Sequence, residues 1–124
     1  METPIVIDSC DVDFVTSKKN DYNEIIYYFK LVDPKLHKKL KPFITASKLE
    51  NGTKLPWWSA DNGEHIMKVK SKHVGKWEQT LVKGGHYNAK LEFVYYDMVE
   101  KGIKGYYAKI GGIKLRVREV EDSD

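Results

Sequence analysis

KLEFVYYDMVEKGIKGYYAKIGGIKLRVREV, residues 90–120, is a series of short apolar and aromatic segments separated by glycines. It predicts three β-strands, Lys90–Val99, Ile103–Ile110 and Ile113–Val120. Valine, isoleucine and tyrosine favour strands, because branched and aromatic side chains pack well on a pleated surface. The breaks Glu100–Gly102 and Gly111–Gly112 are short enough for hairpins, so each strand is expected to turn back on the one before it.

The preceding sequence adds three further predicted strands. Residues 4–15 partly alternate apolar and polar side chains, residues 24–32 (EIIYYFKLV) are apolar on both faces, and residues 65–73 alternate again. Residues 50–64 are expected to be irregular, with asparagine–glycine turns. About six short strands joined by glycine turns predict an all-β domain, either a barrel or a sandwich.

One helix is predicted, and it begins after residue 33. Asp33 is a favourable N-cap, and Pro34 suits the first helical position. Three apolar residues at i, i+4 and i+7 form one stripe: Leu36, Leu40 and Phe43. Pro42 lies inside this pattern, so the regular helix is expected to stop or kink near Lys41.

Length and composition indicate one globular domain. The chain has 124 residues, of which 41% are hydrophobic and 31% charged. No apolar run approaches the roughly 20 residues of a membrane helix, so no membrane partner is expected. The net charge is −4 in residues 1–33, +11 in residues 34–118 and −4 in residues 119–124, which gives +3 for the chain. A basic body with an acidic end predicts a polyanionic partner, the alternative being a solvated lysine surface.

The sequence contains no recognisable catalytic motif. The four histidines are scattered and lack Cys or His partners at metal-ligand spacing: His37, His65, His73 and His86. Four acidic residues are assigned to surface and turn roles rather than to a magnesium site: Asp61, Glu64, Asp97 and Glu100. We therefore expect a binding protein and not an enzyme, with no cofactor and no metal. The single cysteine, Cys10, indicates an intracellular, reducing setting.

The stretch IMKVKSK, residues 66–72, carries the clearest binding pattern. Strand periodicity places Lys68, Lys70 and Lys72 on one face and directs Met67 and Val69 toward the core. Lysines about 7 Å apart along a strand are spaced much like the phosphates of an extended polynucleotide.

Aromatic residues often occur in adjacent pairs: Tyr27-Tyr28, Trp57-Trp58, Tyr95-Tyr96 and Tyr106-Tyr107. Neighbours on a strand point to opposite faces, so a pair offers one ring to the core and one to the other side. An outward ring can stack on any base, worth about 1–3 kcal/mol per base. Tyr27-Tyr28 is assigned to packing and the two later tyrosine pairs to binding, while Trp57-Trp58 is open between capping the barrel and clamping a base. The candidate nucleic-acid-binding residues are Trp57, Trp58, Lys68, Lys70, Lys72, Trp77, Tyr95, Tyr96, Lys104 and Tyr106.

Three stretches resemble, in this order, the single-stranded DNA-binding proteins of podovirus-type tailed bacteriophages. Residues 55–72 contain Pro-Trp-Trp, Asp-Asn-Gly and the lysine-alternating strand; residues 84–97 contain a glycine turn before a strand with tyrosines; residues 105–119 alternate lysine with apolar residues and run into an acidic end. The resemblance implies a small OB-fold barrel of five to six strands with one added helix, over residues 1–118. It also implies sequence-nonspecific binding of single-stranded DNA during viral replication and recombination, in the host-cell cytoplasm.

Carried over to this chain, the resemblance makes Lys68, Lys70 and Lys72 the basic strand and Tyr95 and Tyr96 stacking rings. The chain departs from the family in its acidic tail, residues 119–124, which is short and has no terminal aromatic residue. Recruitment of replication proteins through the tail therefore stays open, as does the choice between monomer and homodimer. The tail is expected to compete with DNA for the basic groove.

The same residues are compatible with two alternative functions. The protein could be an OB barrel that binds RNA, or a viral protein-interaction or structural module. In the second case the lysine face would be incidental. An enzyme with an acidic metal site is a more distant alternative.

Overall fold

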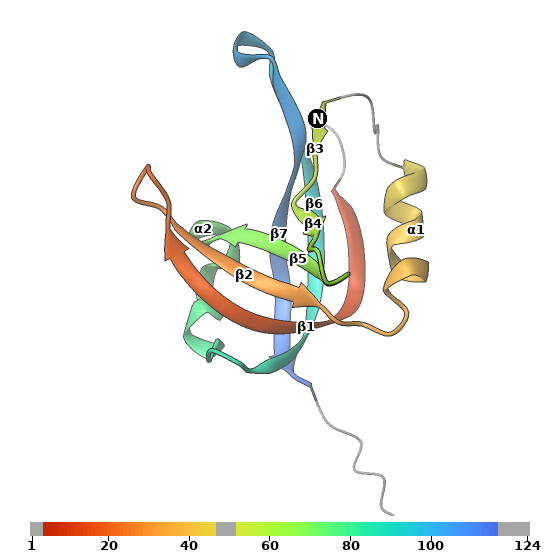
Figure 1. Ribbon diagram of the computed structural model, residues 1–124, viewed down its shortest axis with the longest axis vertical. Coiled ribbons are helices and arrows are strands. Elements are labelled where there is room, and N and C mark those ends of the chain that lie inside the picture. Colours follow the sequence, from red (N-terminus) through yellow and green to blue (C-terminus); the bar gives the residue numbers. More distant parts are fainter. Residues whose placement is uncertain (1–3, 47–51, 117–124) are drawn as a thin grey trace, which may run out of the picture.

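The computed structural model describes residues 4–46 and 52–116 (Figure 1). Its elements are β1 (Ile5–Lys19), β2 (Ile25–Leu31), α1 (Leu36–Ala46), β3 (Thr53–Lys54), β4 (Trp57–Ser59), β5 (His65–Lys70), α2 (Ser71–Val74), the 3₁₀ helix η1 (Gly75–Thr80), β6 (His86–Met98), the 3₁₀ helix η2 (Val99–Lys101) and β7 (Ile103–Leu115). The predicted predominance of β structure is confirmed.

The strands form one seven-stranded sheet in the order β3-β7-β6-β1-β2-β5-β4. Every pairing is antiparallel except that of β3 with β7. The sheet curls, so that β1, β2 and β5 run across the long β6–β7 hairpin (Figure 1). As a result, β5 and β7 are not neighbours in the sheet, yet their Cα atoms come within 8 Å of one another, and α2 contacts both strands. A barrel-like sheet agrees with the prediction, but the strand count is seven instead of five to six.

Two errors in the predicted strands account for the different count. The strands β3 and β4 fall in the stretch expected to be irregular, and β4 pairs with β5 through Trp57–Ser59. Conversely, β7 runs on through Gly111-Gly112, where a hairpin was predicted. Lys90 pairs with Gly112 and Leu91 with Ile110, so Gly111 is the extra residue of a β-bulge. Residues 117–120 of the third predicted strand lie outside the described residues.

The strand predicted over residues 65–73 ends at Lys70. Strand alternation beyond this point would turn Ser71 and His73 toward the core and Val74 away from it. The helical turn α2 instead buries Val74 in the core, which explains why the backbone changes conformation here.

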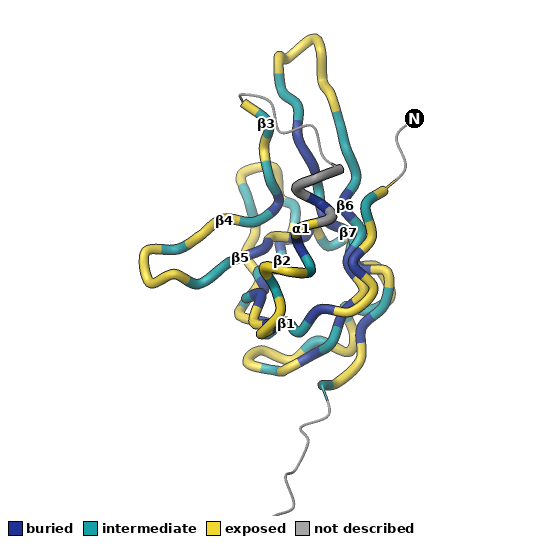
Figure 2. Tube along the Cα trace, turned by 90° about the vertical axis from the view of Figure 1, so that its right-hand side faces the viewer, coloured by how far each residue is buried: buried dark blue, intermediate teal, exposed yellow. Residues whose placement is uncertain are grey.

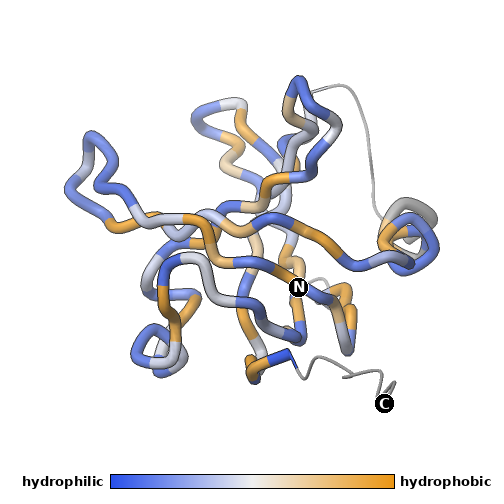
Figure 3. Tube along the Cα trace, turned by 60° about the horizontal axis from the view of Figure 1, so that its bottom comes forward, coloured by the Kyte–Doolittle hydropathy of each residue, from blue (hydrophilic) through white to orange (hydrophobic). Residues whose placement is uncertain are grey.

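The core lies inside the curled sheet, and both α1 and α2 contribute buried side chains to it. Figure 2 shows buried residues along the middle of the strands and exposed residues at the hairpin ends, and Figure 3 shows that these ends are mainly hydrophilic. Leu40 and Phe43 of α1 are buried, as the apolar stripe predicted. The Phe43 ring centroid lies 5.3 Å from that of Phe93 and 4.9 Å from those of Trp57 and Tyr106.

The helix α1 does not stop near Lys41 but continues through Pro42 to Ala46. Proline removes one backbone hydrogen bond from a helix interior and disfavours its continuation. Here Phe43, directly after the proline, is fully buried among three aromatic rings. We attribute the continued helix to this packing, which outweighs the local preference.

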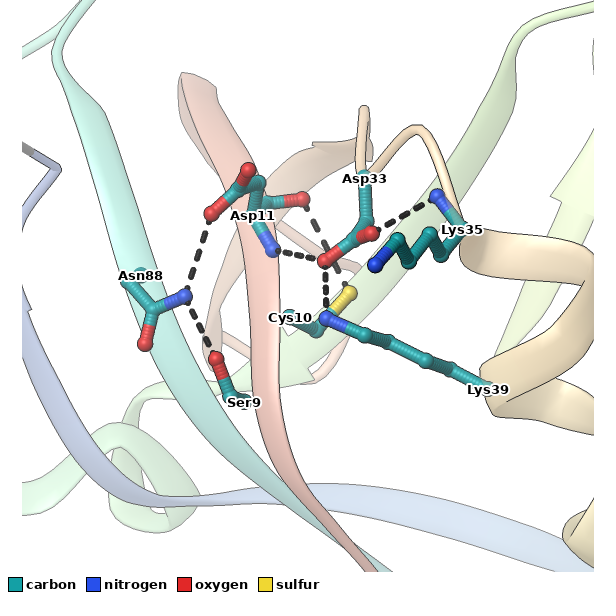
Figure 4. Close-up of polar contacts among 7 residues, drawn as sticks. All are labelled: Ser9, Cys10, Asp11, Asp33, Lys35, Lys39 and Asn88. Atoms are coloured by element: carbon teal, nitrogen blue, oxygen red, sulfur yellow. Dashed lines mark hydrogen bonds and ion pairs between the residues drawn. The ribbon is translucent and has the colours of Figure 1, made fainter. Parts of the chain in front are cut away.

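Asp33 fastens the start of α1 to β1 (Figure 4). One carboxylate oxygen accepts a hydrogen bond from the Lys35 backbone N at 2.8 Å, as expected near an N-cap. The other accepts from the Asp11 backbone N at 3.0 Å and from Lys39 Nζ at 2.6 Å. Burial acts to raise the pKa of Asp33, but these hydrogen bonds and the Lys39 charge outweigh it, so the pKa lies below its ordinary value.

Candidate nucleic-acid interface

A groove of about 760 Å³ lies where β2 and β5 face β7 and the end of β6. We call it the central groove. Its lining includes the lysines Lys54, Lys68, Lys70 and Lys72. It also includes the rings of Tyr28, His73, Tyr96 and Tyr107. Cations and aromatic faces thus share one concave surface.

The strand β5 supplies two of these lysines in the predicted way. Lys68 and Lys70 are exposed, while Met67 and Val69 between them are buried. Lys68 is opposite Tyr28 on β2, so this tyrosine shares the outer face of the sheet with the lysines. Alternation of the strand therefore correctly separated the core face from the face that lines the central groove.

Lys72 reaches the central groove by another route than the one predicted. It belongs to α2, because the strand ends at Lys70. The regular row of three lysines along one strand is therefore wrong. Lys72 nevertheless lines the same groove as Lys68 and Lys70, since α2 packs beside β5 and β7.

The pairs Tyr27-Tyr28 and Trp57-Trp58 are both divided between core and surface. Tyr27 packs against the core, with its ring 5.5 Å from Phe14, whereas Tyr28 lines the central groove. The assignment of both tyrosines to packing therefore missed Tyr28. Trp58 is 42% exposed and meets Tyr28 edge to face at 6.2 Å. Lys18 Nζ lies 5.9 Å from the Tyr28 centroid, so the basic and aromatic surface extends beyond the groove.

Trp57 and Trp77 are placed away from the central groove. The half-buried Trp57 ring packs 4.9 Å from Phe43 and 5.3 Å from Phe93, which makes it a cap of the core. Trp77 belongs to η1, packs against the core, and has Lys76 Nζ 4.9 Å from its ring centroid. Neither ring is among those that line the groove.

The tyrosine pairs of β6 and β7 obey strand alternation. Tyr95 is opposite Tyr106, and the two rings meet at 5.3 Å on the core side. Tyr106 is only 5% exposed, although it is among the residues that line the groove. Tyr96 and Tyr107 lie on the other face, 6.4 Å apart. Tyr107 is thus the outward member of its pair, whereas the list of candidate residues named its partner Tyr106.

Lys104 is opposite Asp97 across the β6–β7 ladder and adjoins Thr53 of β3. It is half-buried and is not among the groove-lining residues. The lysine in this part of the groove is Lys54, which sequence reasoning also missed. Lys54 is brought there by the pairing of β3 with β7, and no local pattern in the sequence signals that pairing.

His73 also lines the central groove, although sequence reasoning assigned it no binding role. Its ring is stacked on that of Tyr107, with centroids 4.4 Å apart and planes 22° apart. Burial, together with the charges of Lys72, Lys109 and Lys70, lowers the pKa of His73 to about 4. The imidazole is therefore neutral at pH 7.

No acidic residue is among the described residues that line the central groove. Within the described residues, Lys70 is the one groove lysine in an ion pair, at 3.5 Å from Glu24. Both side chains of this pair are well exposed, so it stabilises the fold little. A polyanion can compete for Lys70 without breaking a buried interaction.

Residues 4–46 and 52–116 contain no cluster of three His, Cys, Asp or Glu side chains suited to a metal ion. The helices of this part of the chain are too short or too polar to cross a bilayer. No protein-family model matches the chain, and no curated protein matches it in sequence.

Proposed function

We propose that this protein binds single-stranded DNA in the central groove without sequence preference. One observation carries the proposal: four lysines and the rings of Tyr28, Tyr96 and Tyr107 line the same concave surface. Lysines neutralise phosphates whatever the base, and every base has a face that can stack on a ring. Neither interaction reads the edge of a base, so the chemistry is tolerant of sequence.

The order of the strands supports an OB-fold. With the short strands β3 and β4 set aside, the remaining order is β7-β6-β1-β2-β5, with a helical segment between β5 and β6. An OB-fold is a five-stranded, partly open barrel that binds oligonucleotides over its second and third strands. The second and third long strands of this chain are β2 and β5, and both contribute to the central groove.

The biological setting in this proposal is viral DNA replication and recombination in the host cytoplasm. It rests on the resemblance of residues 55–72, 84–97 and 105–119 to phage single-stranded DNA-binding proteins. Contacts between the acidic tail and replication proteins belong to the same proposal. The tail, residues 119–124, and the proposed domain boundary at residue 118 lie outside the described residues.

The test is a titration with oligo-dT, followed by tryptophan fluorescence and repeated at several salt concentrations. Lys68→Gln/Lys72→Gln removes two groove charges, and Lys90→Gln/Lys114→Gln removes two exposed strand lysines outside the groove. Each lost phosphate contact lowers the slope of log K against log salt by about 0.7 for a single strand. We expect the magnitude of this slope to fall by about 1.4 in the groove variant and to stay unchanged in the control variant.

No fluorescence or mobility change with oligo-dT at low salt would end the proposal. An equal decrease of the salt-dependence slope in the two double variants would mean that net charge, and not the groove, governs binding. Competition between poly-dT and poly-U then separates DNA binding from the RNA-binding alternative. If the barrel prefers RNA, poly-U displaces bound oligo-dT more effectively than poly-dT does.

A further inference from the structure

His73 stands out in the central groove as a titratable group among fixed cations. It follows Lys72 on α2, and Lys70 at the end of β5 and Lys109 on β7 also act on it. The acidic group that acts on it is Glu24, just before β2, which itself pairs with Lys70. Glu78 of η1 accepts a hydrogen bond from the Ser71 hydroxyl and is also hydrogen-bonded to Tyr27.

The surroundings of His73 in the free protein disfavour a charged ring. Its Nδ1 is buried and has no hydrogen-bond partner within the described structure. A protonated imidazole donates from both nitrogens, so the charged form would carry a buried N–H without an acceptor. Repulsion from the three lysines acts in the same direction.

A polynucleotide in the groove reverses the second condition, the repulsion from the lysines. Its phosphates neutralise the lysines and bring negative charge close to the imidazole, while the buried Nδ1 stays out of their reach. We propose that His73 takes up a proton from solvent when a single strand occupies the central groove, and then acts as an additional phosphate-binding cation. The inference rests on the proposed function, because it needs a polyanion in this groove.

The consequence is a specific pH dependence of binding. The pKa of free His73 is about 4. If occupancy restores the ordinary histidine pKa of about 6.5, affinity rises by about tenfold between pH 7.5 and pH 5.5 through this residue. The sign follows from linkage: the bound state holds the extra proton, so lowering the pH favours it.

The experiment measures oligo-dT affinity at pH 7.5 and pH 5.5, at constant ionic strength, for wild type and two variants. Thymine does not take up a proton in this range, so the DNA adds no titration of its own. His73→Phe keeps a ring against Tyr107 but cannot be protonated, and His37→Gln is a control on the exposed face of α1. Calorimetry at pH 5.5 in two buffers of different ionisation enthalpy counts the protons taken up.

On going from pH 7.5 to pH 5.5, the affinity of wild type and of His37→Gln should increase by a factor about ten times larger than the factor for His73→Phe. They should also take up more protons than His73→Phe. An equal gain and equal proton uptake in His73→Phe would overturn the assignment to His73. Absence of binding at pH 7.5 in wild type would instead overturn the proposed function, so the two failures are distinguishable.

Discussion

Adjacent tyrosines of β7 have different surroundings although they have the same chemistry. The Tyr106 ring is buried against Phe43 and Tyr95, while Tyr107 carries the His73 stack in the central groove. The difference follows from strand geometry, which turns neighbouring side chains to opposite faces. A substitution at one position should therefore report on the core and at the other on binding.

We expect Tyr106→Leu to lower the free energy of unfolding by about 2–3 kcal/mol, because ring contacts in a packed core are lost. Tyr107→Leu should weaken oligo-dT binding by about 1–3 kcal/mol, the value of one stacked base, with a smaller loss of stability. Urea unfolding and fluorescence titration of both variants measure the two effects. The division would be contradicted by the reverse outcome. In that case Tyr107→Leu would cause the larger loss of stability and Tyr106→Leu the larger loss of oligo-dT affinity.

At the scale of elements, the two-residue strand β3 pairs with β7 of the β6–β7 hairpin and also supplies Lys54 to the central groove. It pairs in parallel with Lys104 and Gly105 of β7. A Cβ atom at Gly105 would come within 2.8 Å of Lys54 Cβ and 2.9 Å of Lys54 N. The absence of a side chain at this position therefore allows β3 to lie against β7, with Lys54 in the groove.

We expect Gly105→Ala to displace β3, because backbone atoms cannot yield as the end of a side chain can. The predicted cost is about 1–3 kcal/mol of stability, with weaker DNA binding as Lys54 moves. Gly112→Ala on the same strand is the matched control, since its Cβ would lie 4.0 Å from Lys90 Cβ. Thermal unfolding should separate the two variants, and equal midpoints would show that the contact with β3 is unimportant.

The sequence predicted the elements whose own pattern determines them. The alternation in β5, the aromatic run of β2 and the apolar stripe of α1 were all recognised. The strands β3 and β4 were missed because two or three residues hold too little periodicity to signal a strand. Gly111-Gly112 was misread because a glycine pair marks a bulge and a hairpin alike.

At the scale of the molecule, the candidate site was only partly predictable. Lys68, Lys70 and Tyr96 were named from local patterns, and they line the central groove. Tyr28 was assigned to packing, His73 was given no binding role, and Tyr107 was named only as one of a pair. Their position in the groove depends on the curling of the sheet that brings β2, α2 and β7 together. Such long-range proximity leaves no mark in a single stretch of sequence.

The charge distribution of the whole chain also makes a prediction. Residues 119–124 carry a net charge of −4, and their removal raises the charge of the chain from +3 to +7. If this tail competes with DNA for the groove, truncation after Arg118 should tighten oligo-dT binding at low salt. The difference should fade as salt approaches about 1 M, where the Debye length is only about 3 Å. A truncated chain with unchanged low-salt affinity would exclude competition by the tail.

The two strands that flank the central groove are not joined to each other. Among the described residues, β5 pairs with β2 and β4, whereas β7 pairs with β6 and β3. Within the described part of the chain, β5 and β7 therefore lie near each other without a backbone ladder between them, and α2 contacts both strands. If the groove binds DNA as proposed, such a seam would let it widen for a purine or narrow for a pyrimidine with every backbone hydrogen bond intact. Indifference to base size would then be an elastic property of the barrel as much as a chemical property of its rings.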